Sequence, residues 1–164
     1  MCAATRTVAA VAALAMTLAT AVSALEQRPL PAFSVLTPAG ERVASASLAS
    51  EPRVLLVYVA DPCGPCGPLW TAMEQWAVEA LPARTVVVVA GTPERAGALA
   101  ASLPDSLGAV RVFADPDGNA REALRLSSTF TIVGLDRGHI RWGLAGVLND
   151  PMALRATLTS WVAR

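Results

Sequence analysis

The chain has 164 residues, of which 54% are hydrophobic and 16% are charged. This length suits one domain with a core of its own, and this composition excludes a disordered chain. Thirteen arginines balance thirteen acidic residues, and lysine is absent. Because the net charge is zero and the arginines are scattered singly, no basic stretch predicts binding to nucleic acid or to anionic lipid.

The first 24 residues have the pattern of an export signal. Arg6 supplies a positive charge, Val8 to Ala21 is rich in alanine, valine and leucine, and Val22-Ser23-Ala24 ends in the small residues of a cleavage site. The apolar run of about 14 residues is short for a bilayer of roughly 30 Å. We therefore expect cleavage after Ala24, leaving residues 25–164 as a single domain. The alternative is an uncleaved membrane tether through residues 8–22.

The next elements, in chain order, are predicted from hydrophobic patterning and turn residues. Phe33–Leu36 and Arg42-Val43 flank a turn with proline and glycine, which predicts a hairpin. Val54–Val59 is continuously apolar, as is typical of a central strand buried on both faces. An amphipathic helix is expected from Leu69 to Leu81, and a second buried strand at Thr85–Ala90.

The second half of the chain continues the alternation of helices and strands. We expect a helix at Pro93–Leu103, a strand at Val110–Phe113, and a short helix at Asn119–Leu126. A hairpin turns at Asp136–His139, and a final helix follows Pro151. This order predicts an α/β fold, with a central mixed β-sheet that is flanked by helices on both faces.

The motif Cys63-Gly64-Pro65-Cys66 lies between the strand that ends at Val59 and the helix that starts near Leu69. A CxxC between a buried strand and a helix predicts redox chemistry, because the helix N-terminus stabilises a thiolate at Cys63. Cys66 would resolve a mixed disulfide, so that Cys63-Cys66 is the redox-active disulfide. A purely structural disulfide is the plainer alternative.

No cofactor or metal is expected. The cleaved chain would hold two cysteines and the single histidine, His139, whereas a closed zinc site takes four ligands. We interpret His139 as a solvated turn residue far from the cysteines. Trp76 is expected in the helix core, and Trp142 and Trp161 in packing, while Trp70 fits either the core or the border of the active site.

The element order and the CGPC motif resemble the thioredoxin fold, and most closely the exported TlpA/ResA-like thiol-disulfide oxidoreductases. The resemblance extends over about Pro31 to Val162 and includes the turn Phe113–Gly118. It implies a four- or five-stranded thioredoxin-like sheet with an N-terminal hairpin and a central insertion, for which Pro93–Leu126 is available. It also implies a periplasmic or envelope location, protein disulfide substrates and a thiol electron donor.

Three positions depart from the family pattern. Thr129, or Ser128 one residue earlier, occupies the position of the family's cis-proline, and Pro62 replaces a tryptophan before the first cysteine. Val57 replaces the buried aspartate that thioredoxin carries six residues before that cysteine. We count Pro62, Gly64, Pro65 and Thr129 as active-site residues that accompany the catalytic Cys63 and Cys66.

These departures keep two other functions open. One is a binding module that retains the thioredoxin fold with weak or no redox turnover. The other is a peroxidase, because peroxiredoxins share the fold and can carry threonine at the cis-proline position. Peroxiredoxins also need a threonine three residues before the reactive cysteine, where this chain has Ala60.

Overall fold

The computed structural model describes residues 28–60, 70, 73–74, 81–146 and 151–162. Each strand and helix that the sequence predicts within these ranges is present. The elements, in chain order, are β1 (Arg28–Pro29), β2 (Ser34–Leu36), β3 (Arg42–Ala44), α1 (Ser45–Leu48), β4 (Val54–Ala60), β5 (Thr85–Ala90), α3 (Pro93–Ser102), a 3-10 turn (Asp105–Leu107), β6 (Arg111–Ala114), α4 (Asn119–Leu124), β7 (Phe130–Asp136), β8 (His139–Ala145) and α5 (Pro151–Val162).

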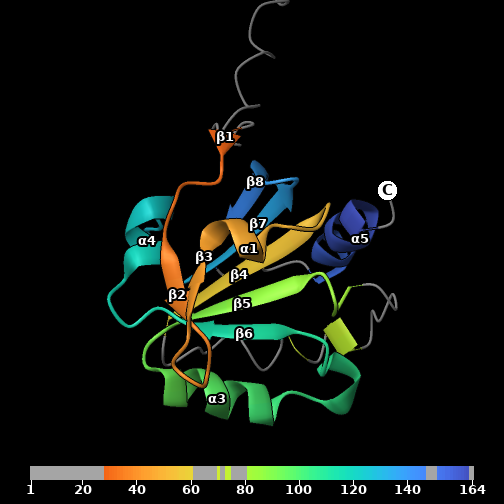
Figure 1. Ribbon diagram of the computed structural model, residues 1–164. Coiled ribbons are helices and arrows are strands. Elements are labelled where there is room, and N and C mark those ends of the chain that lie inside the picture. The colour runs from red at the N-terminus through yellow and green to blue at the C-terminus, as the bar shows by residue number, and fades with distance from the viewer. Residues whose placement is uncertain (1–27, 61–69, 71–72, 75–80, 147–150, 163–164) are drawn as a thin grey trace, which may run out of the picture.

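The described strands form one mixed sheet in the order β1-β8-β7-β4-β5-β6-β2-β3 (Figure 1). The strands β4, β5 and β6 run parallel to one another, and β7 runs antiparallel to β4. Eight strands exceed the four or five that the family resemblance implied. The difference arises at the edges, where β1 pairs with β8 and the predicted hairpin joins β6 through the pair Leu36 and Ala114.

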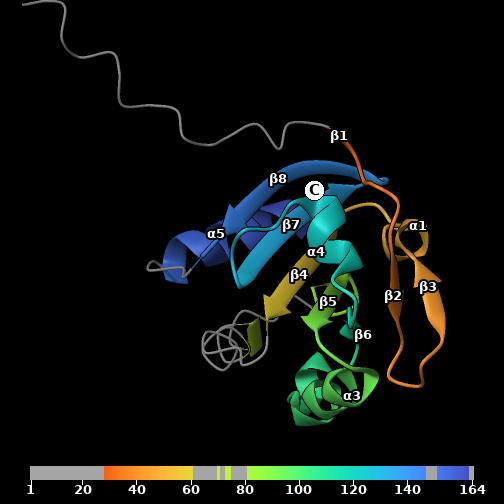
Figure 2. The same cartoon turned by 90° about the vertical axis from the view of Figure 1, so that its left-hand side faces the viewer.

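The two faces of the sheet carry separate cores, and the central strand β4 contributes to both. Leu55, Val57 and Val59 pack on the face that α3 and α5 cover, whereas Leu56 and Tyr58 pack on the face of α1 and α4. Figure 2 shows α5 and α3 on one side of the strands and α1 and α4 on the other. Because successive side chains of a strand point to opposite faces, a strand covered on both faces reads as a continuous apolar run.

Three arginines fix the C-terminal ends of helices to the sheet. Arg111 donates to the carbonyl oxygen of Leu48, the last residue of α1, and Arg28 donates to that of Leu124, the last residue of α4. Arg53 donates to the carbonyl oxygen of Trp161 in the last turn of α5. Each guanidinium thus satisfies a carbonyl that the helix leaves unpaired and lies at the negative end of the helix dipole.

The β7–β8 hairpin turns through Arg137 and Gly138, whose φ angles are 50° and 76°. Positive φ at both central residues is the geometry of a two-residue turn that matches the twist of antiparallel strands. β8 extends from His139 to Ala145, and α4 ends at Leu124 rather than at the expected Leu126. In the described part of the chain, no helix is long and apolar enough to cross a membrane.

Candidate functional site

The predicted redox motif follows the carboxyl end of β4. That strand ends at Ala60, three residues before Cys63. Pro62, Cys63, Gly64, Pro65 and Cys66 themselves lie outside the described residues, so their roles and the Cys63-Cys66 disulfide stay predictions. A chain of three residues spans at most about 11 Å, which bounds the distance of the Cys63 Cα from the end of the central strand.

Neighbouring strands define the edge of the sheet at which the motif begins. Ala60 is in register with Ala90, the last residue of the parallel strand β5. On the other side, the backbone N–H of Ala60 donates to the carbonyl oxygen of Thr129 over 2.7 Å. The carboxyl ends of β4 and β5 and the start of β7 therefore meet at one place, as they must if the following loops are to share a site.

Thr129 is exposed and directly precedes Phe130, the first residue of β7. The N–H of Phe130 donates to the Ser128 hydroxyl over 3.3 Å. The structure thus places Thr129 beside the end of the strand that leads into the motif. Its carbonyl oxygen already accepts the bond from Ala60, and its role toward a substrate stays a prediction.

Two described residues after the motif, Trp70 and Met73, are buried at 7% and 2% exposure. Both belong to the core on the face of α3 and α5, where they pack in the cluster of Val57. The structure therefore decides the alternative that the sequence left open for Trp70 in favour of the core. Trp76 lies outside the described residues.

His139 is exposed and lies at the far end of the sheet from Ala60. It pairs with Asp136 at the end of β7, while Phe130, at the start of β7, pairs with Val59. A strand of seven residues separates the two positions by roughly 20 Å. The expectation of a solvated turn histidine is confirmed. Within the described ranges, no group of three or more His, Cys, Asp or Glu residues could hold a metal ion.

A buried pair that the sequence analysis missed lies on the other face of the sheet. The hydroxyl of Tyr58 donates to Asp115 Oδ2 over 3.2 Å, and Tyr58 and Asp115 are 1% and 2% exposed. The Asp115 carboxylate also accepts the backbone N–H groups of Ala120 and Arg121 and so caps α4. Because Tyr58 packs on the face opposite Val57 and Trp70, Asp115 does not replace the missing buried aspartate of thioredoxin.

Burial first, and then the Asp115 carboxylate, raise the pKa of Tyr58 above its ordinary value. A group whose pKa is raised in the folded state stabilises the fold at pH values below its unfolded pKa, which is about 10 for tyrosine. This stabilisation is lost as the pH rises further. Tyr58 is the only tyrosine of the chain, so absorbance at 295 nm reports its ionisation alone. We expect it to titrate above pH 10, with stability falling there. Tyr58→Phe should abolish that part of the alkaline fall, and an unchanged fall would contradict the assignment.

No family model matches the chain, and no curated protein matches it. Solved structures do match. A Chlorobium tepidum protein assigned as the thiol:disulfide interchange protein DsbE is 20% identical, with a TM-score of 0.64 over 84% of this chain and 97% of that one. A thiol:disulfide interchange protein from Bacteroides sp. is 15% identical, with a TM-score of 0.62 over 85% and 91%.

A third similar structure is the pneumococcal exposed lipoprotein thioredoxin from Streptococcus pneumoniae. It is 19% identical, with a TM-score of 0.57 over 79% of this chain and 98% of that one. Likeness at these identities establishes the fold. The chain has a thioredoxin-like fold, as the sequence analysis expected, and its structural neighbours include thiol:disulfide interchange proteins.

Proposed function

We propose that the chain is an exported thiol-disulfide oxidoreductase that reduces or exchanges disulfides of envelope proteins through Cys63 and Cys66. The observation that carries the proposal is the position of Ala60. It ends the central strand of a thioredoxin-like sheet, and the CGPC motif starts three residues later. The exposed location of the pneumococcal relative, together with the signal-like residues 1–24, supports the envelope as the compartment.

In the proposed reaction, the Cys63 thiolate attacks one sulfur of a substrate disulfide. The mixed disulfide forms, and the other substrate sulfur leaves as a thiolate that takes up a proton. The Cys66 thiolate then attacks Cys63, closes the Cys63-Cys66 disulfide and releases the second substrate thiol. The substrate gains two electrons and the protein loses two, which a separate dithiol donor must return. No cofactor takes part.

The test is disulfide reduction by the full chain, with insulin as substrate and dithiothreitol as donor. Cys63→Ser should lower the rate at least 100-fold, because it removes the attacking thiolate. Cys66→Ser should trap a mixed disulfide that can be isolated without reductant. Cys2→Ser is the matched control, since it removes the third cysteine of the chain outside the motif, and it should leave the rate unchanged.

The reduction potential of the Cys63-Cys66 pair distinguishes the direction of electron flow. A value near or below about −250 mV makes the protein a reductase, whereas about −120 to −180 mV makes it an oxidant or isomerase. If the wild-type chain shows no turnover while Cys63→Ser still captures the same partner protein, the chain is instead a binding module. The apolar Val57 in place of an acidic residue is the observation that favours that second candidate.

A further inference from the structure

The outer side of β8 is only partly paired in the described part of the chain. β1 pairs with β8 at two positions, Arg28 with Ile140 and Pro29 with His139. β8 continues to Ala145, and among the described residues no strand pairs with its outer side beyond Ile140. Unpaired backbone N–H and C=O groups at the edge of a sheet are a template for pairing with another extended chain.

The hydrogen bonds of the sheet show which backbone groups point outward from β8. The N–H of Gly146 donates to the carbonyl oxygen of Phe130 over 2.9 Å, so Gly146 faces β7. Backbone groups alternate sides along an antiparallel strand, so Leu144 also faces β7, whereas Gly143 and Ala145 face away from it. We call the outward N–H and C=O groups of Gly143 and Ala145 the open edge. It holds two donors and two acceptors.

The side chains along the open edge leave room for a second backbone. The stretch Trp142–Ala145 contains no charged residue and no proline, the residue types that commonly protect strand edges from pairing. A glycine inside a strand often marks a bulge or a place where another backbone approaches closely. The irregularity of this hairpin falls at Arg141, between the residues that pair with Gly134 and Leu135, so it does not account for Gly143.

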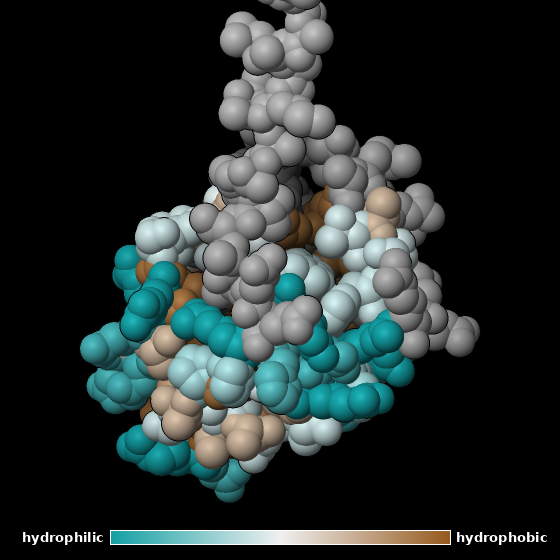
Figure 3. Space-filling model, turned by 90° about the horizontal axis from the view of Figure 1, so that it is seen from above, coloured by the Kyte–Doolittle hydropathy of each residue, from teal (hydrophilic) through white to brown (hydrophobic). Residues whose placement is uncertain are grey.

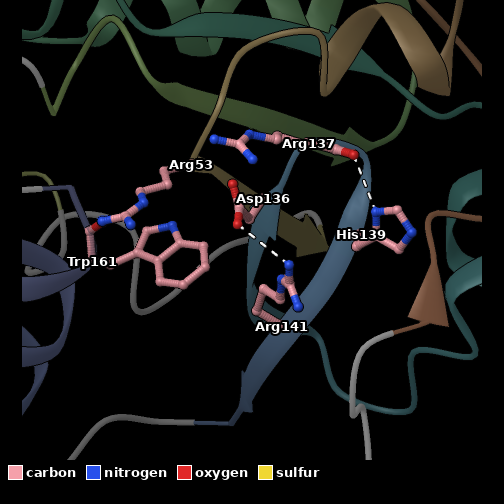
Figure 4. A network of polar contacts seen from close by, with 6 residues as sticks. All are labelled: Arg53, Asp136, Arg137, His139, Arg141 and Trp161. Carbon is pink, nitrogen blue, oxygen red and sulfur yellow. Dashed lines mark hydrogen bonds and ion pairs between the residues drawn. The ribbon is translucent and has the colours of Figure 1, made fainter. Parts of the chain in front are cut away.

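The charged groups of the hairpin lie at its other end. Arg141 forms an ion pair with Asp136 over 3.4 Å, and His139 Nδ1 lies 3.1 Å from the carbonyl oxygen of Arg137, as Figure 4 shows. Figure 3 views the molecule from the side at which β8 lies in Figure 1. The described surface there is largely hydrophilic, and its hydrophobic side chains lie in small separate areas. The open edge therefore offers a partner main-chain hydrogen bonds rather than charge or a large apolar area.

The open edge lies at the end of the sheet where the CGPC motif begins. Ala145 pairs with Thr131, and the preceding Phe130 pairs with Val59, one residue before β4 ends. β8 and β4 both run antiparallel to β7, so their carboxyl ends point the same way, as their arrowheads show in Figure 2. A strand added to β8 would lie three strand spacings from β4, which is about 14 Å.

We propose that the open edge binds an extended segment of the protein substrate as an added antiparallel strand. The inference rests on the proposed redox function, which brings a polypeptide with a disulfide to this end of the sheet. The antiparallel direction is the one that β1 already takes on the same side of β8. Pairing through main-chain groups gives affinity and leaves the sequence around the substrate disulfide free to vary.

The direction of the added strand fixes where the substrate cysteine lies. β8 runs toward the end of the sheet at which the motif begins, so an antiparallel segment runs away from that end. The amino end of the segment is therefore the one nearer to Cys63, and the reacting cysteine precedes the paired residues. Four residues between that cysteine and the paired segment span at most about 14 Å, the distance from the added strand to β4.

The test is a single turnover of the reduced full chain with a mixed disulfide between a peptide and 2-nitro-5-thiobenzoate. The peptide has an amino-terminal cysteine, four glycine and serine residues, and a tail of five threonines, which favour a strand. Cys63 attacks the peptide sulfur, the thiobenzoate leaves as a thiolate, and Cys66 then releases the peptide thiol. The chain carries Cys2→Ser, so that only the motif reacts. Compared with the same peptide without threonines, the tail should raise the second-order rate constant at least fivefold.

N-methylation of the tail distinguishes strand pairing from a looser contact. Because N–H groups alternate sides along a strand, methyl groups on the first and third threonines face the opposite way from methyl groups on the second and fourth. We expect one of these two peptides to lose the gain and the other to keep it. A tail placed before the cysteine should give no gain. Equal losses in the two methylated peptides, or equal gains from tails on either side, would overturn the proposal.

Two proline variants locate the pairing on the protein. Ala145→Pro removes one outward N–H, which an edge strand tolerates, and should lower the gain from the tail at least threefold. Ala44→Pro is the matched control and should leave the gain unchanged. Ala44 ends β3 at the opposite edge of the sheet, and its φ of −77° suits proline. An unchanged gain in Ala145→Pro would contradict the assignment to β8. If that variant does not fold, the methylated peptides decide.

The same measurements separate this proposal from the proposed redox function. If the peptide without threonines releases no thiobenzoate, both proposals fail. If it reacts and the tail adds nothing, only the strand pairing fails. A dimeric mass in light scattering, together with the absence of a gain, would assign the open edge to a second copy of the chain and overturn the proposal.

Discussion

Replacing Gly134 with alanine should lower the free energy of unfolding by about 3 kcal/mol, as expected for overpacking at a site that cannot relax. Gly134 is buried in β7, and an added Cβ would lie 2.3 Å from Cε2 and Nε1 of Trp142. The backbone cannot retreat, because Gly134 pairs with Leu55 on one side and with Trp142 on the other. The indole must therefore move.

Displacement of Trp142 would also loosen α5. The rings of Trp142 and Trp161 meet edge to face, with centres 5.6 Å apart and planes at 87°. Such aromatic contacts stabilise proteins by about 1 kcal/mol beyond the area they bury. Trp161 in turn carries the contact with Arg53, so the disturbance reaches the C-terminal end of the last helix.

Urea unfolding, followed by tryptophan fluorescence, measures the effect. Gly97→Ala is the matched control, because a Cβ there would meet Pro38 Cβ at 3.6 Å, an ordinary contact, inside helix α3. Gly97→Ala should raise the free energy of unfolding by up to about 1 kcal/mol, because alanine favours a helix more than glycine does. In the Gly134→Ala background, Trp142→Leu should recover part of the loss. An unfolding midpoint unchanged by Gly134→Ala would refute the close contact.

Replacing Asp115 with alanine should cost about 3 kcal/mol, because it leaves three buried donors without their acceptor. These donors are the Tyr58 hydroxyl and the backbone N–H groups of Ala120 and Arg121, at 3.1 to 3.2 Å. Asp115 also joins two parts of the fold, since it follows β6 and caps α4 while it holds a side chain of the central strand.

A double-mutant cycle separates the two roles of Asp115. Tyr58→Phe removes one hydroxyl and should cost about 1 kcal/mol, the size of a single buried hydrogen bond. If the tyrosine bond is real, the double variant should lose less than the sum of the two single losses. Exact additivity would contradict the bond between the side chains and leave only the capping of α4.

The strands of this fold could be predicted from local sequence because each carries its own signal. Val54–Val59 and Thr85–Ala90 are continuous apolar runs with turn residues on either side, and both are buried strands in the structure. The width of the sheet could not be predicted in the same way. It depends on Leu36 pairing with Ala114, and pairing between residues so far apart leaves no local pattern.

Some features of the candidate site could likewise be predicted from the sequence, and others could not. The CGPC motif and the strand before it could be predicted from the sequence, whereas the structure shows that Thr129 lies beside the end of that strand. The Tyr58–Asp115 pair could not be predicted, because a hydrogen bond between residues 57 positions apart forms only when β4 and β6 share a sheet. Its one local trace was the turn at Asp115, which fits an exposed loop equally well.

The sequence by itself determined the fold class, the order of the elements and the placement of two cysteines after a central strand, because periodicity and turn chemistry act over a few residues. Only the tertiary structure decided which charges become neighbours. Thirteen arginines balance thirteen acids along the chain, yet Arg53, Arg84 and Arg111 come to one edge of the sheet because the neighbouring parallel strands β4, β5 and β6 begin at or next to them. Net charge is a sum over the sequence, whereas the charge of a surface region depends on which strand ends lie together in the fold.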